Sequence, residues 1–219
     1  KFKNEKLKSI YVGPSEDDRD VQKNINMFID DSFKVKLYND EKELLSIIAN
    51  FLKKGKIIAW HQDKMEYGPR ALGNRSILAN PTIPSIKNEI NKKIKTREAF
   101  RPFAPSVLEE FVEKYFIVNR SSNYNFMNIT CQTKPDYINI FQNVLNSDGS
   151  ARIQTVNEET NKRYYNLIKE FYKLSNYALV LNTSLNIQEP ICCNSEDTLK
   201  LFIKSDIDVL CIQNFVIQR

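Results

Sequence analysis

Short apolar segments alternate with amphipathic segments along the whole chain, and this alternation limits the possible folds more than any other feature. "KIIAW" (56–60) and "YALVLNTSL" (177–185) are apolar runs of strand length, whereas 161–174 has apolar residues at helical spacing. Interleaved strands and helices favour an α/β fold with helices packed on a sheet. Because such elements occur throughout the sequence, we expect one domain over residues 1–219.

Periodicity and local signals place the individual elements. The expected strands are 9–13, 33–38, 56–60, 151–156, 177–185 and 208–217. The expected helices are 15–28, 44–52, 85–94, 161–174 and 195–204, the last capped by Ser195. Ser106 and Glu109 have the spacing of a helix capping box within 105–116. Polar residues dominate 119–148, which predicts a long loop.

Composition excludes several classes of protein and site. No apolar run approaches the roughly 18 residues of a membrane span, and no signal peptide is visible. The four cysteines form no CxxC pair, which is typical of reduced, mostly buried thiols in a cytoplasmic protein. His61 is the only histidine, so a multi-histidine metal site is impossible, and we interpret it as structural. The chain starts at Lys1 rather than Met, which is compatible with a preceding domain.

Positive charge is concentrated in one part of the sequence. Residues 69–106 hold eight Lys and Arg against two Glu, a net charge of +6, whereas the whole chain carries +5. The rest of the chain therefore sums to −1. A local excess of this kind favours an anionic ligand.

"EYGPRALGNRSIL", which begins at Glu66, lies within this basic window and directly follows an expected strand. It holds two of the chain's five glycines, Gly68 and Gly73. Glycine permits backbone conformations and close approaches that a side chain would block. Such a backbone could fix Arg70 and Arg75 to bind phosphate or carboxylate oxygens. The alternative is a structural turn whose arginines bind backbone carbonyls or pair with Glu66.

"KTREAFRPFAPS" (95–106) is a second cluster of cations. On an extended backbone, Lys95 and Arg97 would share one face. Arg101 lies among aromatic and proline residues, where a cation loses solvation and needs an anion. The alternative is a solvated basic face next to an aromatic cluster.

Two weaker signals come later in the chain. Ser184 and Asn186 lie two residues apart at the end of an expected strand, which is where open α/β sheets bind ligands. An ordinary polar turn would explain them equally well. Arg152 follows an Asp-Gly turn and enters a strand, an arrangement that alone indicates little.

Taken together, these segments resemble one family. "MEYGPRALGNRSILANP", "NKKIKTREAFRPFAPSVLEE", "DGSARIQTV" and "LNTSLNIQEPI" occur in the order found in the C-terminal domain of carbamoyltransferases. That family includes nodulation-type and antibiotic-tailoring O-carbamoyltransferases. The resemblance covers the chain from about Tyr11 to its end.

The resemblance implies a YrdC-like fold, a twisted open mixed sheet flanked by helices and shared with threonylcarbamoyl-adenylate synthases. It also implies binding of ATP, with Mg²⁺, and of carbamoyl phosphate to form carbamoyl adenylate. A separate N-terminal metal-binding domain of the same protein would then transfer the carbamoyl group to an acceptor hydroxyl. The Lys-x-Arg and Ser-x-Asn signatures of the fold match Lys95 and Arg97, and Ser184 and Asn186.

The resemblance also suggests roles for the candidate residues. Lys95, Arg97 and Arg101 would be catalytic by neutralising the phosphates and holding the attack geometry. Arg70, Arg152, Ser184 and Asn186 would bind substrate. The reaction requires no side-chain nucleophile.

This sequence departs from the family pattern at three places. Asn146 stands where a histidine usually precedes the Asp-Gly turn, and Asp63 stands where a glycine is usual. The segment 186–190 lacks a glycine before Glu-Pro. These departures leave a catalytically degenerate remnant as one alternative. An RNA-binding module is a second alternative, but a nucleic-acid partner is less expected than ATP and carbamoyl phosphate. A membrane partner is not expected.

Overall fold

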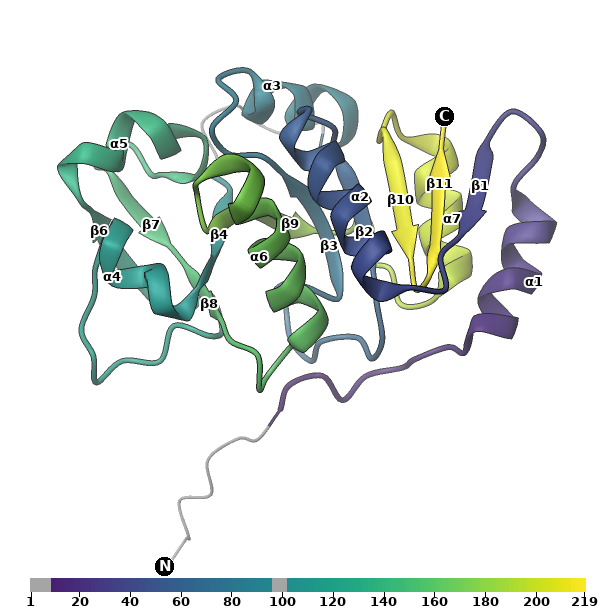
Figure 1. The fold of residues 1–219 in the computed structure, drawn as a ribbon, viewed down its shortest axis with the longest axis horizontal. Helices are drawn as coiled ribbons and strands as arrows, with labels where there is room; N and C mark the ends of the chain where they lie inside the picture. Colours follow the sequence, from purple (N-terminus) through teal and green to yellow (C-terminus); the bar gives the residue numbers. More distant parts are fainter. Residues whose placement is uncertain (1–8, 96–101) are drawn as a thin grey trace, which may run out of the picture.

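A computed structural model describes residues 9–95 and 102–219 (Figure 1). The helices are α1 (Asp18–Phe28), α2 (Glu41–Lys53), α3 (Ile86–Ile90), the π-helical turn η1 (Asn91–Lys95), the 3₁₀ turn η2 (Glu109–Phe111), α4 (Val112–Tyr115), α5 (Pro135–Phe141), the 3₁₀ turn η3 (Gln142–Val144), α6 (Lys162–Ser175) and α7 (Ser195–Lys204). The strands are β1 (Lys34–Leu37), β2 (Ile58–His61), β3 (Arg75–Ala79), β4 (Ala104–Leu108), β5 (Phe116–Ile117), β6 (Thr130–Thr133), β7 (Ser150–Arg152), β8 (Gln154–Val156), β9 (Leu179–Ser184), β10 (Val209–Ile212) and β11 (Phe215–Gln218).

A mixed eight-stranded sheet is the centre of the fold. Its strand order is β1-β11-β10-β2-β3-β9-β4-β8, in which β10 with β2 and β4 with β8 are parallel pairs and the other pairs are antiparallel. Helices α2 and α6 pack together in front of this sheet in Figure 1, and α7 lies behind it. The expected α/β class, with helices flanking an open mixed sheet, is confirmed.

Local sequence signals explain the limits of the two front helices. Asp40 caps α2 by accepting a hydrogen bond from Lys42 N, and Gly55 takes a positive φ of 83° shortly after the helix ends. Asn161 caps α6 through Tyr164 N, and Asn176 closes the helix in the left-handed conformation at φ 64°. Both helices therefore begin at a capping side chain and end next to a residue that adopts a positive φ.

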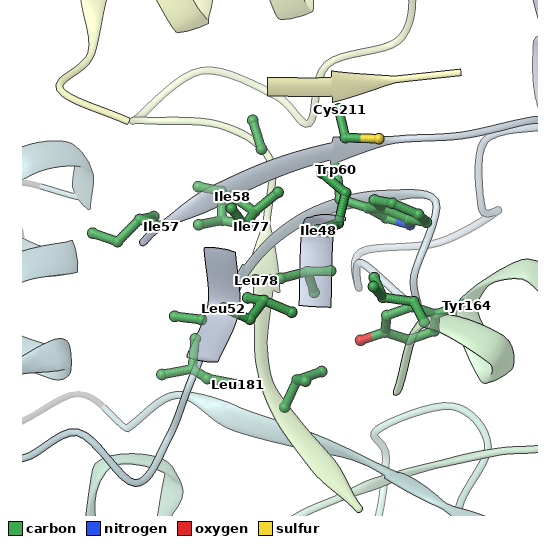
Figure 2. Packing of buried hydrophobic residues seen from close by; sticks show 14 of the residues in the cluster. Ile48, Leu52, Ile57, Ile58, Trp60, Ile77, Leu78, Tyr164, Leu181 and Cys211 are labelled. Atoms are coloured by element: carbon green, nitrogen blue, oxygen red, sulfur yellow. The ribbon is translucent and has the colours of Figure 1, made fainter. Parts of the chain in front are cut away.

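The hydrophobic core fills the space between the front helices and the centre of the sheet (Figure 2). Ile48 and Leu52 from α2 and Tyr164 from α6 are fully buried against residues of the central strands. Trp60 in β2 and Leu181 in β9 are among the strand residues that meet them. Burial of each large apolar side chain contributes roughly 1.5–3 kcal/mol, which fixes these helices on the strands that carry the candidate site.

A second, three-stranded sheet of order β5-β6-β7 lies beside β4 and β8. The expected single strand 151–156 is instead two strands, because the chain leaves the small sheet after Arg152 and enters the large sheet at Gln154. Buried Ile153 lies at the crossing. Arg152 is therefore held at the corner between the two sheets.

Two further expectations were wrong because pairing between distant strands overrides local pattern. Ser106 does not cap a helix; it lies in the middle of the fully buried strand β4, opposite Val180 of β9. The expected single strand 208–217 is a hairpin of β10 and β11. The turn between these strands has Gln213 at a positive φ of 48°. Glycine is the usual sign of such a conformation, and because none occurs here, the sequence did not reveal the turn.

The remaining differences concern weak signals. The expected loop 119–148 contains β6 and α5, whose apolar residues are widely spaced among polar ones. The expected strand 9–13 makes a single bridge, between Tyr11 and Glu66. Strand β3 was not predicted, and Asn194 rather than Ser195 caps α7.

The described part of the chain also bears on the expectations about membrane spans and cysteines. No helix in the described ranges is long and apolar enough to cross a membrane. The four cysteines are free thiols, and three of them are buried, as expected.

Candidate functional site

The loop between β2 and β3, which carries Arg70, is fixed by a buried carboxylate. Glu66 is 4% exposed, and its Oε1 accepts hydrogen bonds from the backbone nitrogens of Leu72 at 2.7 Å, Asn74 at 2.7 Å and Arg75 at 3.2 Å. Three donors on one carboxylate satisfy backbone groups that would otherwise be buried without partners. The second half of the loop therefore wraps around Glu66.

Side chains from distant elements hold the carbonyl groups of the same loop. Asn182 Nδ2 of β9 donates to Ala71 O at 3.1 Å, and Gln154 Nε2 of β8 donates to Leu72 O at 2.7 Å. The Tyr11 hydroxyl also donates to Leu72 O, at 2.8 Å, and the Trp60 indole donates to Gly73 O at 2.7 Å. Each of these contacts joins the loop to a different element, so its position is defined by the whole fold.

Gly73 is required by its backbone conformation and by its neighbour. Its φ of 109° disfavours other residues, and a Cβ atom would lie 2.2 Å from the ring of Tyr164. The glycine therefore lets the loop lie directly against α6. Gly68 has a φ of 115° with open space around it, so conformation alone explains that glycine.

Arg75 is structural, as the second interpretation of this motif proposed. The side chain is fully buried, and its Nη1 donates to Gln62 O at 2.6 Å. Its Nη2 donates to Asp63 O at 3.1 Å, and its Nε donates to Cys193 O at 3.4 Å. The guanidinium thus joins the loop to the segment before α7 and is not available to a ligand.

Arg70 and Arg152 differ from Arg75, because their guanidinium groups are not held by backbone carbonyls of the described residues. Arg70 is exposed, and Arg152 is half-buried with its Nε out of contact with solvent and without a hydrogen-bond partner. Burial, followed by the charge of Arg70, lowers the pKa of Arg152. Within residues 9–95 and 102–219, neither guanidinium has an acidic partner. Two neighbouring cations without a counter-ion are the arrangement that an anion would stabilise.

Ser184 and Asn186 contact each other at the end of β9. Ser184 Oγ donates to Asn186 Oδ1 at 2.7 Å, and Asn186 Nδ2 donates to Glu189 O at 2.6 Å. Ser184 lies opposite Ser76 in the pairing of β9 with β3, and Ser76 Oγ accepts a hydrogen bond from Gly73 N at 3.1 Å. The Ser-x-Asn segment is therefore attached to the strand that follows the Arg70 loop.

The three expected catalytic cations lie at or beyond the limit of the described structure. Lys95 is the last residue of the π-helical turn η1, so its backbone is helical rather than extended as expected. Arg97 and Arg101 lie outside the described residues. Their roles remain predictions from the sequence.

Residues 49–219 match the model of the family described as Carbamoyltransferase C-terminus. This chain belongs to the carbamoyltransferase C-terminus family. The resemblance that the four motifs indicated is confirmed.

A curated relative supports the family of this carbamoyltransferase C-terminal chain, and solved structures of other proteins support its fold. It is 37% identical over 179 residues to the nodulation protein NolO of Bradyrhizobium diazoefficiens, covering 81% of this chain and 33% of that protein. Full-length HypF in its phosphate- and nucleotide-bound form is similar in fold, with a TM-score of 0.58 at 20% identity over 78% of this chain and 25% of HypF.

Sua5 of P. abyssi in complex with L-threonine is also similar in fold, with a TM-score of 0.55 at 14% identity over 81% of this chain and 48% of Sua5. The YrdC-like fold expected for this carbamoyltransferase C-terminal chain is confirmed. The chain spans about a third of the length of the curated relatives it matches.

The departures from the family pattern have local structural explanations in this carbamoyltransferase C-terminal chain. Asp63, at the usual glycine position, adopts a φ of 38°, a region that favours glycine. Asn146 Nδ2 donates to Ser150 Oγ at 2.8 Å across the Asp-Gly turn. The Glu189 carboxylate accepts from the backbone of Ile187 at 2.9 Å and of Gln188 at 3.0 Å, which closes the glycine-free loop after Asn186.

His61 plays a structural part in the carbamoyltransferase C-terminal fold. It is fully buried, its Nδ1 lies 2.7 Å from Thr198 Oγ1, and burial holds its pKa well below the usual value. Among the residues with described positions, no three His, Cys, Asp or Glu side chains gather where they could hold a metal ion.

Sequence reasoning missed the residues that position the carbamoyltransferase motif. Glu66 was considered only as a partner for arginine, and Gln154 and Asn182 were not singled out. A polar residue inside an otherwise apolar strand is the one signal they offer. Asn182 interrupts "ALVLNTSL", and Gln154 lies two residues after Arg152. Buried polar side chains at such places require partners, which here are the loop carbonyls.

Proposed function

We propose that this domain binds ATP and carbamoyl phosphate and forms carbamoyl adenylate. The observation that carries the proposal is the pair Arg70 and Arg152, two neighbouring cations that have no acidic partner in the described part of the chain. Family membership supports carbamoyl chemistry. The phosphate- and nucleotide-bound form of HypF, which has the same fold, supports a nucleotide ligand.

Carbamoyl phosphate is first split by water into carbamate and phosphate. A carbamate oxygen then attacks the α-phosphorus of ATP, the bond to the β-phosphate oxygen breaks, and pyrophosphate leaves. The product is carbamoyl adenylate. Because both substrates are anions, they repel each other, and the cations of the domain would have to neutralise them and align the attack.

The cations have two proposed roles. Arg70 and Arg152 bind phosphate oxygens, and Lys95, Arg97 and Arg101 neutralise the reacting phosphates. Ser184 and Asn186 donate hydrogen bonds to the phosphates or to the carbamoyl group. Mg²⁺ enters on the triphosphate as part of the substrate. A separate N-terminal domain would then transfer the carbamoyl group to the hydroxyl of an acceptor, with AMP as the leaving group. The curated relatives, of which this chain matches about a third, are long enough to hold such a domain.

Calorimetric titration with ATP and Mg²⁺, with and without carbamoyl phosphate, tests the binding part of the proposal. We expect a compact site whose affinity falls when Arg70 or Arg152 is replaced by alanine. Arg97→Ala and Arg101→Ala should each lower the rate of pyrophosphate release about a hundredfold, the equivalent of on the order of 3 kcal/mol. Binding of RNA in place of ATP, with a steep salt dependence and tolerance of each single replacement, would contradict it.

A further inference from the structure

The segments that carry Arg70 and Arg152 are joined by one buried side chain. Gln154 follows Arg152 by two residues, and its Nε2 donates at 2.7 Å to the backbone oxygen of Leu72, which follows Arg70 by two residues. Gln154 is 2% exposed. The hydrogen bond therefore spans the gap between the corner of the two sheets and the loop between β2 and β3.

The orientation of the Gln154 amide is fixed at its other end. Its Oε1 accepts from Ser106 Oγ at 2.6 Å and from Asn182 Nδ2 at 3.1 Å. With the oxygen held by two donors, the amide nitrogen has to point toward Leu72. Asn182 Nδ2 also donates to Ala71 O at 3.1 Å, so the same network holds two consecutive loop carbonyls. The buried hydrogen bonds of Gln154, Ser106 and the Asn182 amide nitrogen therefore restrict how far these two carbonyls can move.

The two cations themselves oppose this arrangement. Arg70 and Arg152 carry like charges, and burial, followed by the charge of Arg70, lowers the pKa of Arg152. Without an anion between them, repulsion favours a wider separation. The buried contacts of the loop oppose such a separation. Among them, the Gln154–Leu72 hydrogen bond joins the loop to the segment of Arg152.

We propose that Gln154 is a positioning residue that sets the separation of Arg70 and Arg152 through Leu72 O, so that the pair is ready to bind a phosphate-bearing ligand. The inference rests on the proposed anion site. Preorganisation of this kind raises affinity because the ordering of the loop is completed before binding. Gln154 is buried and has no need to touch the ligand.

A double-mutant cycle tests this inference. Gln154→Met keeps the length of the side chain and removes its hydrogen bonds. We expect it to weaken binding of ATP and Mg²⁺, measured by calorimetry with carbamoyl phosphate present, about tenfold, the equivalent of about 1.4 kcal/mol. In an Arg70→Ala background the same replacement should cause no further loss. A structural effect unrelated to Arg70 would reduce affinity equally in both backgrounds.

Asn143 supplies the matched control. It is 4% exposed, and its Nδ2 donates to Pro81 O at 2.9 Å and to Ile83 O at 2.9 Å, away from Ala71 and Leu72. Asn143→Leu should therefore lower the denaturation midpoint as Gln154→Met does and leave the affinity for ATP unchanged. If Gln154→Met does not fold, Gln154→Asn carries the same cycle, because its neutral amide is one methylene shorter and no longer reaches Leu72 O.

The outcomes separate this inference from the proposed function. Unchanged affinity in Gln154→Met, or an equal loss in both backgrounds, overturns the positioning role while the anion site stands. Unchanged affinity in both Arg70→Ala and Arg152→Ala removes the anion site, and the positioning role with it.

Discussion

Burial, followed by the charge of Arg70, lowers the pKa of the Arg152 guanidinium, and neither arginine has an acidic partner in the part of the chain that the structure describes. Arg75, only five residues after Arg70, is fully buried on backbone carbonyls. Under the proposed function, one short motif thus supplies one arginine for the ligand, whereas the other arginine holds the fold.

Replacement of Arg152 by methionine should reduce ligand binding without reducing stability. The change removes a half-buried cation that has no acidic partner in the described ranges and is repelled by Arg70. We expect the affinity for ATP and Mg²⁺ to fall about tenfold or more, and the melting temperature to stay the same or rise.

Calorimetry and thermal unfolding measure the two effects on the same samples. Arg120→Met is the control, because Arg120 is exposed and pairs with Glu113 at 2.6 Å on another part of the surface. A melting temperature that falls while affinity stays constant would assign Arg152 to the fold instead.

Replacement of Arg75 by methionine, unlike replacement of Arg152, should reduce stability. The buried carbonyl of Gln62 and the partly buried carbonyls of Asp63 and Cys193 would lose their donor. Since each unsatisfied buried group costs about 1–3 kcal/mol, we expect the free energy of unfolding to fall by at least about 3 kcal/mol. Urea denaturation measures the loss, with the exposed Arg19→Met as the control. Equal midpoints for the two variants would refute the structural role.

Asn186→Ala should affect binding more than stability. The Asn186 side chain is half-buried and bonds Ser184 and Glu189, so its loss should lower the free energy of unfolding by about 1 kcal/mol. Under the proposed function, the affinity for ATP or carbamoyl phosphate should fall clearly. Asn119→Ala is the control. It removes a comparable hydrogen bond in an exposed turn, where Ser121 N donates to Asn119 Oδ1 at 3.0 Å. Intact affinity with a large drop in melting temperature would favour the polar-turn interpretation.

Stability should fall as pH rises from 9 to 10. Burial raises the pKa of Cys131, Cys192 and Cys211 to about 12, from an ordinary value of 9.0. Above pH 9 these thiols ionise in the unfolded chain and stay protonated in the folded one, so the unfolded state is favoured as protons are released. Each group contributes up to about 1.4 kcal/mol per pH unit.

Urea midpoints at pH 8, 9 and 10 measure this slope. A variant with alanine at the three buried positions should show a shallower decline than a Cys193→Ala control, whose thiol is half-exposed. Identical slopes in the two variants would show that the buried thiols do not cause the effect.

The sequence predicted most elements whose stability is local. The amphipathic segment 161–174 and the apolar run 177–185 correspond to α6 and β9 because helical period and strand hydrophobicity can be recognised without tertiary context. Ser106 shows where this fails. A capping-box spacing occurs there by chance, and pairing with β9 and β8 decides the conformation.

The candidate site could be predicted only in part for the same reason. Spacing within the motif could not separate Arg70 from Arg75, because the partners of Arg75 include carbonyls of Pro14 and Cys193, far away in the chain. The roles of Gln154 and Asn182 depend equally on the approach of a distant loop. The contact of Ser184 with Asn186 was accessible, since both belong to one short segment.

Carbamoyl phosphate-dependent release of pyrophosphate from ATP is the most direct test of the proposed function. The folded chain is incubated with ATP and Mg²⁺, and pyrophosphate is followed before and after carbamoyl phosphate is added. We predict that release requires both substrates and falls about tenfold or more in Arg70→Ala and Arg152→Ala, with Arg120→Met unchanged. A well-folded sample that releases no pyrophosphate with both substrates present would contradict the account and favour a domain that has lost catalysis.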